Sequence, residues 1–404
     1  MTAAALGTTP EFRDRFAFAL RLARKQTVGR LRRSLAAFLG VAGGIVLVMV
    51  QLGFQSALYE SAVRLHHALD GDVVIVAPEF QSIQGLTWVP RTTLERAAGH
   101  PAVVAVHPLF LSQLMVRNVD NRRFSIILGI GIDPDSPAIP ADRLGPDAAS
   151  LRLPGRVLFD EIGQPLYGDV LGRLSRDGDI ELVTATAQRP LQRAFVVSGR
   201  YRMGATIVFP GSMVASEATL LDAIGQSRER VNVGVLRLAP GADVTAVARD
   251  LRIALAGEAD VETKASFVAR ERDFWSKETP IGILFDMGAV IGFLISAVFV
   301  YQVLFQTIDE NISEYALLKT LGFRYWFFAV VVLATAVLIV LAAFPPALGL
   351  SVLVYWICGS ATQLPVEMTV GRVAAVMGFA LAVAAASALL AVRRLGRADP
   401  AGLL

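Results

Sequence analysis

The stretch YWFFAVVVLATAVLIVLAAFPPALGLSVLVYWICGSATQLPV, residues 325–366, contains no charged residue. About 20 apolar residues in a helix cross the hydrocarbon core of a membrane. The stretch is therefore longer than one crossing needs and short for two crossings with a turn. We predict one long transmembrane helix at residues 325–358 and an outer loop at residues 359–371. Pro345 and Pro346 are expected to kink this helix rather than end it, because neighbouring membrane helices can satisfy the freed backbone groups.

Three further segments are long and apolar enough to cross a membrane, at residues 34–59, 279–306 and 372–392. The chain is 54% hydrophobic and 18% charged, whereas charged residues make up about a quarter of a typical soluble domain. Its net charge of +3 does not indicate nucleic-acid binding, because the arginines cluster beside the apolar segments. The sequence predicts four transmembrane helices that contact membrane lipid.

Lysine and arginine residues at the ends of the chain predict its orientation. Residues 1–33 and the tail at 393–404 are rich in them, and such residues favour the cytoplasmic side. Both termini are therefore expected in the cytoplasm, with residues 60–278 outside and residues 307–324 inside. Apolar residues at three- and four-residue steps in residues 1–33 predict an amphipathic helix on the inner membrane face. A helical extension of the first transmembrane helix is the alternative.

Residues 60–278 are predicted to form a mixed α/β extracytoplasmic domain. β-branched runs bounded by Gly and Pro indicate strands at 72–78 and 124–133, with a short helix between them. Four more strand-like runs follow: RVLFD (156–160), DIELVTA (179–185), RAFVVSG (193–199) and ATIVFPG (205–211). Residues 231–255 have the pattern of a strand, a turn and a helix. We predict two subdomains, one built from both ends of the segment and the second a β-rich insertion at about 150–225.

Motifs for catalysis and for metal or cofactor binding are missing from the sequence. It has no G-x-x-x-x-G-K-[ST] phosphate loop, no H-E-x-x-H, no G-x-S-x-G and only one cysteine, Cys358. The histidines are expected at the surface or as cap residues; they are His66, His67, His100 and His107. The chain is therefore predicted to have no catalytic residues, no metal site and no cofactor of its own.

Two G-x-x-x-G pairs lie in the first two apolar segments, Gly40 with Gly44 and Gly288 with Gly292. Small residues allow membrane helices to approach closely. The pairs are predicted either to join two whole chains in a dimer or to pack the first two transmembrane helices within one chain. Asp286, at the outer end of the second apolar segment, is interpreted as a functional polar contact or as a residue at headgroup level.

The stretch DENISEYALLKTLGF, residues 309–323, places charged residues between two apolar segments. It is predicted to form one amphipathic helix on the cytoplasmic side, with Gly322 as a C-cap. Its apolar positions recur at three- and four-residue spacings; they are Ile308, Ile312, Tyr315, Leu318 and Leu321. This helix is interpreted either as an interfacial anchor or as a projection that docks on a partner protein.

The segment SEYALLKTLGF (313–323) resembles the coupling-helix signature of the FtsX/MacB class of ABC transporter permeases. The predicted order of helices and the large extracytoplasmic domain are similar as well. Residues 51–78, QLGFQSALYESAVRLHHALDGDVVIVAP, together with residues 309–323, are similar to the DevC permeases, which are exporter subunits. Many members of the class carry an arginine three residues before the coupling acid, where this chain has Asn311.

The resemblance implies an inner-membrane homodimer bound to a separate ABC ATPase subunit, which holds the ATP and Mg²⁺. It implies export of a lipid-like or other hydrophobic cargo by mechanotransmission, with a periplasmic membrane-fusion adaptor and an outer-membrane channel. Lipid or lipoprotein extraction, and signalling to a cell-wall hydrolase or sensor, are the alternatives. The residues implied in ATPase coupling are Glu310, Glu314, Leu317, Leu318, Lys319, Leu321 and Gly322.

Overall fold

The computed structural model describes residues 17–24, 35–185, 193–321, 323 and 325–397. The chain divides into two compact units. The helical unit combines Met1–Gln55, Leu284–Ile357 and Val366–Leu404, and the α/β unit combines Ser56–Ile283 and Cys358–Pro365.

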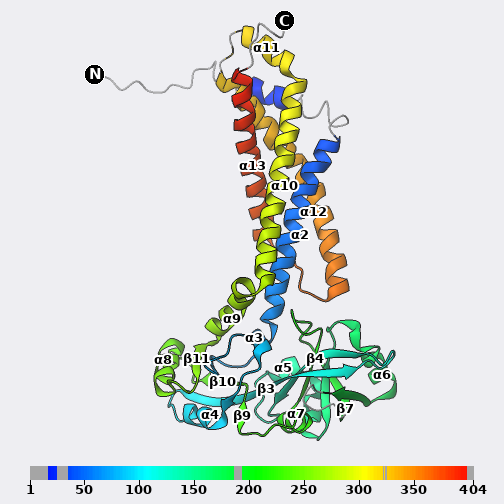
Figure 1. Cartoon of the computed structure of the whole chain (residues 1–404), viewed down its shortest axis with the longest axis vertical. Helices are drawn as coiled ribbons and strands as arrows, with labels where there is room; N and C mark the ends of the chain where they lie inside the picture. The colour runs from blue at the N-terminus through cyan, green and yellow to red at the C-terminus, as the bar shows by residue number, and fades with distance from the viewer. Residues whose placement is uncertain (1–16, 25–34, 186–192, 322, 324, 398–404) are drawn as a thin grey trace, which may run out of the picture. The chain divides into compact units, whose positions relative to one another are not determined.

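Four helices in the described residues are long and apolar enough to cross a membrane, as predicted (Figure 1). They are α2 (Leu35–Ala62), α10 (Pro280–Glu310), α12 (Tyr325–Thr362) and α13 (Val370–Arg397). Each extends beyond at least one predicted end, and the outer loop shortens to residues 363–369. Pro345 and Pro346 both lie inside α12, which continues past them.

The helical unit has one apolar core to which α2, α10, α12 and α13 all contribute. Alanines form a stripe along α13 and allow its neighbours to approach closely. The buried members of this stripe are Ala380, Ala384, Ala388 and Ala391. The helix at residues 17–24 adds Ala19 to the same core, and Leu22 packs against it. The rest of the predicted amphipathic helix at residues 1–33 lies outside the described residues.

The α/β unit is built on a sheet of nine strands in the order β11-β1-β10-β3-β4-β8-β5-β7-β6. The strands are β1 (Val73–Val76), β3 (Val103–Arg117), β4 (Phe124–Ile132), β5 (Arg156–Asp160), β6 (Ile180–Ala185), β7 (Arg193–Tyr201), β8 (Ser212–Ser216), β10 (Val233–Leu238) and β11 (Asp260–Thr263). A separate pair is formed by β2 (Val89–Pro90) and β9 (Arg230–Val231).

The long strand β3 takes part in both halves of this sheet. Its first half pairs with β10, and its second half pairs with β4. Near its end, Met115 and Val116 also pair with Ala185 and Thr184 of β6. Strands β3, β4, β8, β5, β7 and β6 therefore close into a ring, while β10, β1 and β11 extend from β3 as an open sheet.

Helices cover both faces of the open part. Leu94 of α4 (Arg91–Ala98) and Val247 of α8 (Val244–Ala254) pack on one face. Leu65 of α3 (Arg64–Ala68) and Phe267 of α9 (Lys264–Asp273) pack on the other.

The remaining described helices are α5 (Ala141–Leu144), α6 (Val170–Asp177), α7 (Glu217–Ile224) and α11 (Ile312–Thr320). The shorter turns are the 3-10 turns η1 (Ile83–Gly85), η2 (Pro146–Arg152) and η3 (Pro165–Tyr167) and the π-helical turn η4 (Phe274–Glu278).

The segment at about 150–225 is rich in strands, as predicted, and its strands β5 to β8 join the same nine-stranded sheet as the rest of the domain. The prediction of a strand at residues 205–211 is wrong. Thr206 N donates to Phe209 O at 2.8 Å and closes a turn. Pro210 has no N–H group, so it cannot donate a hydrogen bond to a neighbouring strand.

Candidate functional site

The predicted coupling segment forms two helical pieces instead of one continuous helix. α10 continues to Glu310, and α11 begins at Ile312 after a break at Asn311, whose side chain is buried. Asn311 N donates to Ile308 O at 3.1 Å across this break. At the other end, Phe323 N donates to Leu318 O at 3.2 Å, a bond typical of a helix C-terminus. The expected cap, Gly322, lies outside the described residues.

One side of α11 is exposed and carries both apolar and acidic side chains. Leu317 and Leu321 are 63% and 67% exposed, and Glu314 is exposed as well. Their spacing of three and four residues places them on one side of a helix. We call Glu314, Leu317 and Leu321 the α11 face; Glu310, just before the break, is also exposed.

The exposed side of α11 is not the stripe that the spacing predicted. Ile308 is buried and Leu318 packs against the helical core, but Leu321 points out of it. Leu318 is therefore placed to support α11 from within, and Leu317 takes the exposed position. The side chain of Lys319 lies outside the described part of the chain.

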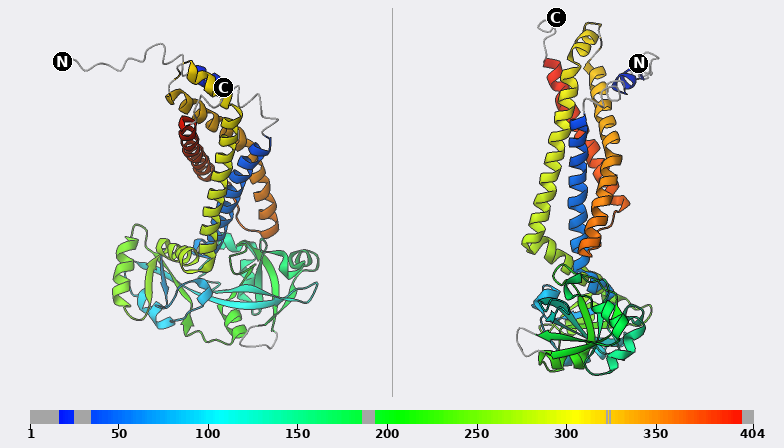
Figure 2. Two further views of the ribbon diagram at one scale, coloured as in Figure 1. Left: turned by 45° about the horizontal axis from the view of Figure 1, so that its top comes forward. Right: turned by 90° about the vertical axis from the view of Figure 1, so that its right-hand side faces the viewer.

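The helix at residues 17–24 packs against the start of α12 (Figure 2). The ring of Phe18 lies 6.3 Å from that of Phe323 and 6.0 Å from that of Phe327, both stacked. Phe327 is completely buried. Phe323 and the start of α12 are therefore joined to the helix at residues 17–24 by an aromatic cluster.

Both G-x-x-x-G pairs lie where α2 and α10 of the same chain meet. A Cβ atom on Gly44 would lie 2.9 Å from the Cα atom of Ser296, and one on Gly40 would lie 2.8 Å from the Phe299 ring. A Cβ on Gly288 would lie 2.5 Å from the Gln51 amide. Gly292 has ordinary clearance of 3.6 Å from Leu47 and Val48 of α2. Three of the four glycines thus allow contacts within one chain that a side chain would obstruct.

Asp286 also contributes to the contact between α2 and α10. Gln55 Nε2 donates to Asp286 Oδ1 at 2.7 Å, and Gln51 Nε2 donates to Phe285 O at 3.1 Å. Asp286 is exposed and holds a neighbouring helix through a side-chain amide. Asp286 thus links two apolar helices through a hydrogen bond.

The expectation that the histidines lie at the surface or cap helices is wrong for two of them. His66 is fully buried, and His107 is 4% exposed. The Nδ1 atom of His107 lies 2.8 Å from Ser136 Oγ, and the ring of His66 lies 4.4 Å from that of Phe267. Within the described residues, no three His, Cys, Asp or Glu side chains are grouped as metal ligands.

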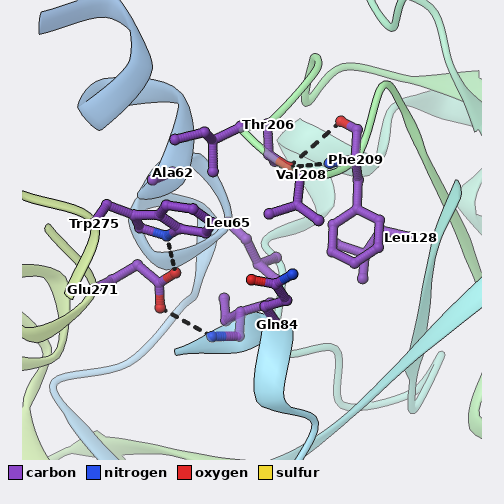
Figure 3. Close-up of a pocket in the computed structure, with 11 residues that line it drawn as sticks. Ala62, Leu65, Gln84, Leu128, Thr206, Val208, Phe209, Glu271 and Trp275 are labelled. Atoms are coloured by element: carbon purple, nitrogen blue, oxygen red, sulfur yellow. Dashed lines mark hydrogen bonds between the residues drawn. The ribbon is translucent and has the colours of Figure 1, made fainter. Parts of the chain in front are cut away.

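A small cavity lies beside the buried carboxylate of Glu271 (Figure 3). Glu271 accepts hydrogen bonds from Trp275 Nε1 at 2.8 Å and from Ile83 N at 3.0 Å. Apolar side chains line most of the cavity, including Leu65, Leu128 and Phe209. Its volume of about 20 Å³ is sufficient for about one water molecule. A cargo or a cofactor does not fit into it.

Sequence reasoning missed a second buried carboxylate, at Asp160 where β5 ends. Its Oδ1 accepts from Ile162 N and Met203 N, and its Oδ2 accepts from Gly204 N at 2.8 Å and from Ser212 Oγ at 3.2 Å. Burial raises the pKa of Asp160, and these hydrogen bonds oppose the rise. An aspartate after a short apolar run is common in sequences, so local pattern offers no signal for this arrangement.

The α11 helix lies in a region that matches a known protein family. Residues 287–400 match the family described as FtsX-like permease C-terminal. Residues 287–400 are therefore similar to the C-terminal part of FtsX-like permeases. The matched region includes α11, α12 and most of α10, so the α11 face lies within it. The match confirms the FtsX-type class predicted from the coupling segment, and the closer similarity to DevC permeases stays a prediction.

Solved structures of several proteins resemble part of this chain, and no curated protein matches it in sequence. The periplasmic region of MacB from Actinobacillus actinomycetemcomitans is 10% identical, covers 50% of this chain and 92% of its own, and has a TM-score of 0.31. The extracellular domain of the ABC-type transporter YknZ from Gram-positive bacteria is 11% identical, with coverages of 48% and 99% and a TM-score of 0.32. A domain of a permease protein from Porphyromonas gingivalis is 13% identical, with coverages of 49% and 90% and a TM-score of 0.30.

Proposed function

We propose that this FtsX-like permease is the membrane subunit of an ABC transporter. It acts as a homodimer in the inner membrane and couples to a separate ATPase subunit that binds ATP and Mg²⁺. The observation that carries the proposal is the α11 face, which presents Leu317, Leu321 and Glu314 within the permease domain.

The chemistry of the α11 face suits a protein partner. Burying one leucine side chain contributes about 1.5–3 kcal/mol. Two neighbouring leucines, both more than half exposed, offer enough apolar surface to anchor a short helix in a groove. Glu314 beside them favours a groove with basic residues at its rim. This partner would be the ATPase, docking from the cytoplasm.

Movement of α11 would pass into α12 through the cluster of Phe18, Phe323 and Phe327. This cluster joins the N-terminal helix to the start of α12 by ring contacts. From there α12 continues as one helix to Thr362. An ATP-driven push on α11 would therefore displace a long helix, which is the mechanotransmission that the family resemblance implies.

The α/β unit would lie in the periplasm and receive a membrane-fusion adaptor, with an outer-membrane channel completing the export path. The cargo would be lipid-like or otherwise hydrophobic. These two features rest on the similarity of residues 51–78 and 309–323 to DevC permeases. Lipid extraction and transmembrane signalling would use the same coupling step at α11.

The test is co-purification of the full chain with its candidate ATPase, followed by ATP turnover. The variant pair Leu317→Asp with Leu321→Asp removes the apolar anchor, while Glu314→Lys reverses the charge. If the leucines contribute at least 3 kcal/mol together, the double variant should weaken the complex by about a hundredfold or more. The double variant should also fail to stimulate ATP turnover by the ATPase.

The matched control is Ile253→Asp, which changes a 71% exposed apolar residue on α8 of the α/β unit. It should leave the complex and its turnover unchanged. An intact, fully active complex in the double leucine variant would show that α11 is an interfacial anchor, and the proposal would be abandoned.

A further inference from the structure

Arg64 bonds to two segments that are far apart in the sequence. Its Nη1 donates to Ala205 O at 2.9 Å, and its Nη2 donates to Gln363 O at 3.5 Å. Gln363 is the first residue after α12 and has a left-handed backbone with φ of 57°. The forked guanidinium of one arginine therefore connects the loop before β8 to the end of the longest helix.

The loop around residue 204 is shaped to admit this arginine. A Cβ atom on Gly204 would lie 1.9 Å from Arg64 Nη1, and the φ of Gly204 is +92°. Only glycine meets both requirements without strain. Gly204 N in turn donates to Asp160 Oδ2 at 2.8 Å, so the same loop is fixed to β5. Contact is thus continuous from Gln363 through Arg64 and the loop to the sheet.

A second side chain of the α/β unit holds the end of α12. Gln164 Nε2 donates to Thr362 O at 3.3 Å, and Gln164 N donates to Pro210 O at 2.7 Å. The last carbonyl groups of a helix lack partners within it and carry a partial negative charge. At α12, the Gln164 amide supplies such a partner to Thr362, and Arg64 donates to the carbonyl of the next residue. The segment Cys358–Pro365 accordingly groups with the α/β unit, while the body of α12 groups with the helical unit.

We propose that Arg64 is the joint through which displacement of α12 reaches the α/β unit, with residues 202–211 as the loop that receives it. The inference rests on the proposed function, which supplies the displacement at α11. Thr206 and Phe209 of the receiving loop line the cavity beside Glu271. Movement of this loop would therefore act on the core that connects α3, α9 and η4.

Hydrogen exchange followed by mass spectrometry tests the joint on the full chain in complex with its ATPase, with and without a non-hydrolysable ATP analogue. The wild type should show a nucleotide-dependent difference in exchange at residues 358–362 and also at residues 202–211. Arg64→Ala should keep the difference at 358–362 and lose it at 202–211, while ATPase binding remains. If Arg64 had a purely structural role, Arg64→Ala would raise hydrogen exchange equally in both nucleotide states. The nucleotide-dependent difference at residues 202–211 would then remain.

Two further variants keep the test decisive. Arg64→Lys retains the charge but cannot reach both carbonyl groups, so it should also lose the difference at 202–211; it replaces Arg64→Ala if that variant does not fold. Arg228→Ala is the control, because Arg228 is an exposed arginine of the same unit that pairs with Glu217 at 3.5 Å.

The outcomes separate the joint from the proposed function. If the ATPase does not bind the wild type, or nucleotide changes exchange nowhere, the proposed function fails and the joint fails with it. If the wild type responds at 358–362 but not at 202–211, or if Arg64→Ala and Arg64→Lys retain the response at 202–211, only the joint is overturned.

Discussion

Glu271 Oε2 lies 3.4 Å from His66 Nε2, and both side chains are buried. Glu271 belongs to α9 and His66 to α3, so the pair joins the two helices on one face of the open sheet. Glu271 also accepts from the backbone of Ile83 and from the indole of Trp275. One carboxylate thus accepts hydrogen bonds from Ile83 and Trp275 and also lies beside the ring of His66.

Glu271→Ala should destabilise the α/β unit strongly. The substitution leaves the N–H groups of Ile83 and Trp275 buried without their acceptor, and it removes the partner of His66. Each buried donor left without its acceptor costs about 1–3 kcal/mol. Denaturant unfolding of the full chain in detergent, followed by tryptophan fluorescence, measures the change.

The control for Glu271 is Lys277→Ala, which breaks an exposed pair with Asp273 four residues earlier. Exposed pairs of this type contribute about 0–1 kcal/mol. Equal effects of the two substitutions would mean that water replaces the Glu271 carboxylate without loss, and that the carboxylate does not hold these segments together.

Asp160 predicts a pH dependence of stability. Its native pKa is raised above the ordinary 3.8, chiefly by burial. The folded state therefore binds this proton more tightly than the unfolded chain does. The resulting stabilisation is fully present below pH 3.8 and is lost as the pH rises through the higher native pKa. Above that pKa the contribution is constant.

Comparison of the wild type with Asp160→Asn isolates this titration. Both chains are unfolded by denaturant at a series of pH values from 3.8 to neutrality. The advantage of the wild type over the variant should shrink as the pH rises and then level off. An advantage that grows with pH would show the opposite sign, with the four hydrogen-bond donors outweighing burial and holding the native pKa of Asp160 below its ordinary value.

The transmembrane helices could be predicted from the sequence because membrane insertion depends on local composition. A run such as residues 325–366 has no charge, and nothing outside it is needed to identify a membrane helix. The same holds for the helix of residues 312–320, where the family signature is local as well. The exposed side of α11 was not predictable, because Leu317 and Leu318 differ only in what the surrounding helices cover.

The α/β unit was harder to predict because its decisive contacts are distant in the sequence. β3 contains Pro108, which argues against a long strand. Pro108 nevertheless pairs with Gly234 of β10, and the same strand then continues to β4 and β6. Arg64 contacts partners 141 and 299 residues away. No periodicity in a short window can indicate contacts over such separations.

Substitutions of Gly44 and Gly292 test whether the G-x-x-x-G pairs pack two helices within one chain or join two chains in a dimer. Gly44→Ala places a methyl group 2.9 Å from the Ser296 backbone, so α2 and α10 must move apart at a cost of about 1–3 kcal/mol. Gly292→Ala meets only ordinary contacts at 3.6 Å and should change stability by less than about 0.5 kcal/mol. Unfolding in detergent measures both, and light scattering reports the oligomeric state. If Gly44→Ala dissociated a dimer without weakening the single chain, the pair would serve contacts between chains instead.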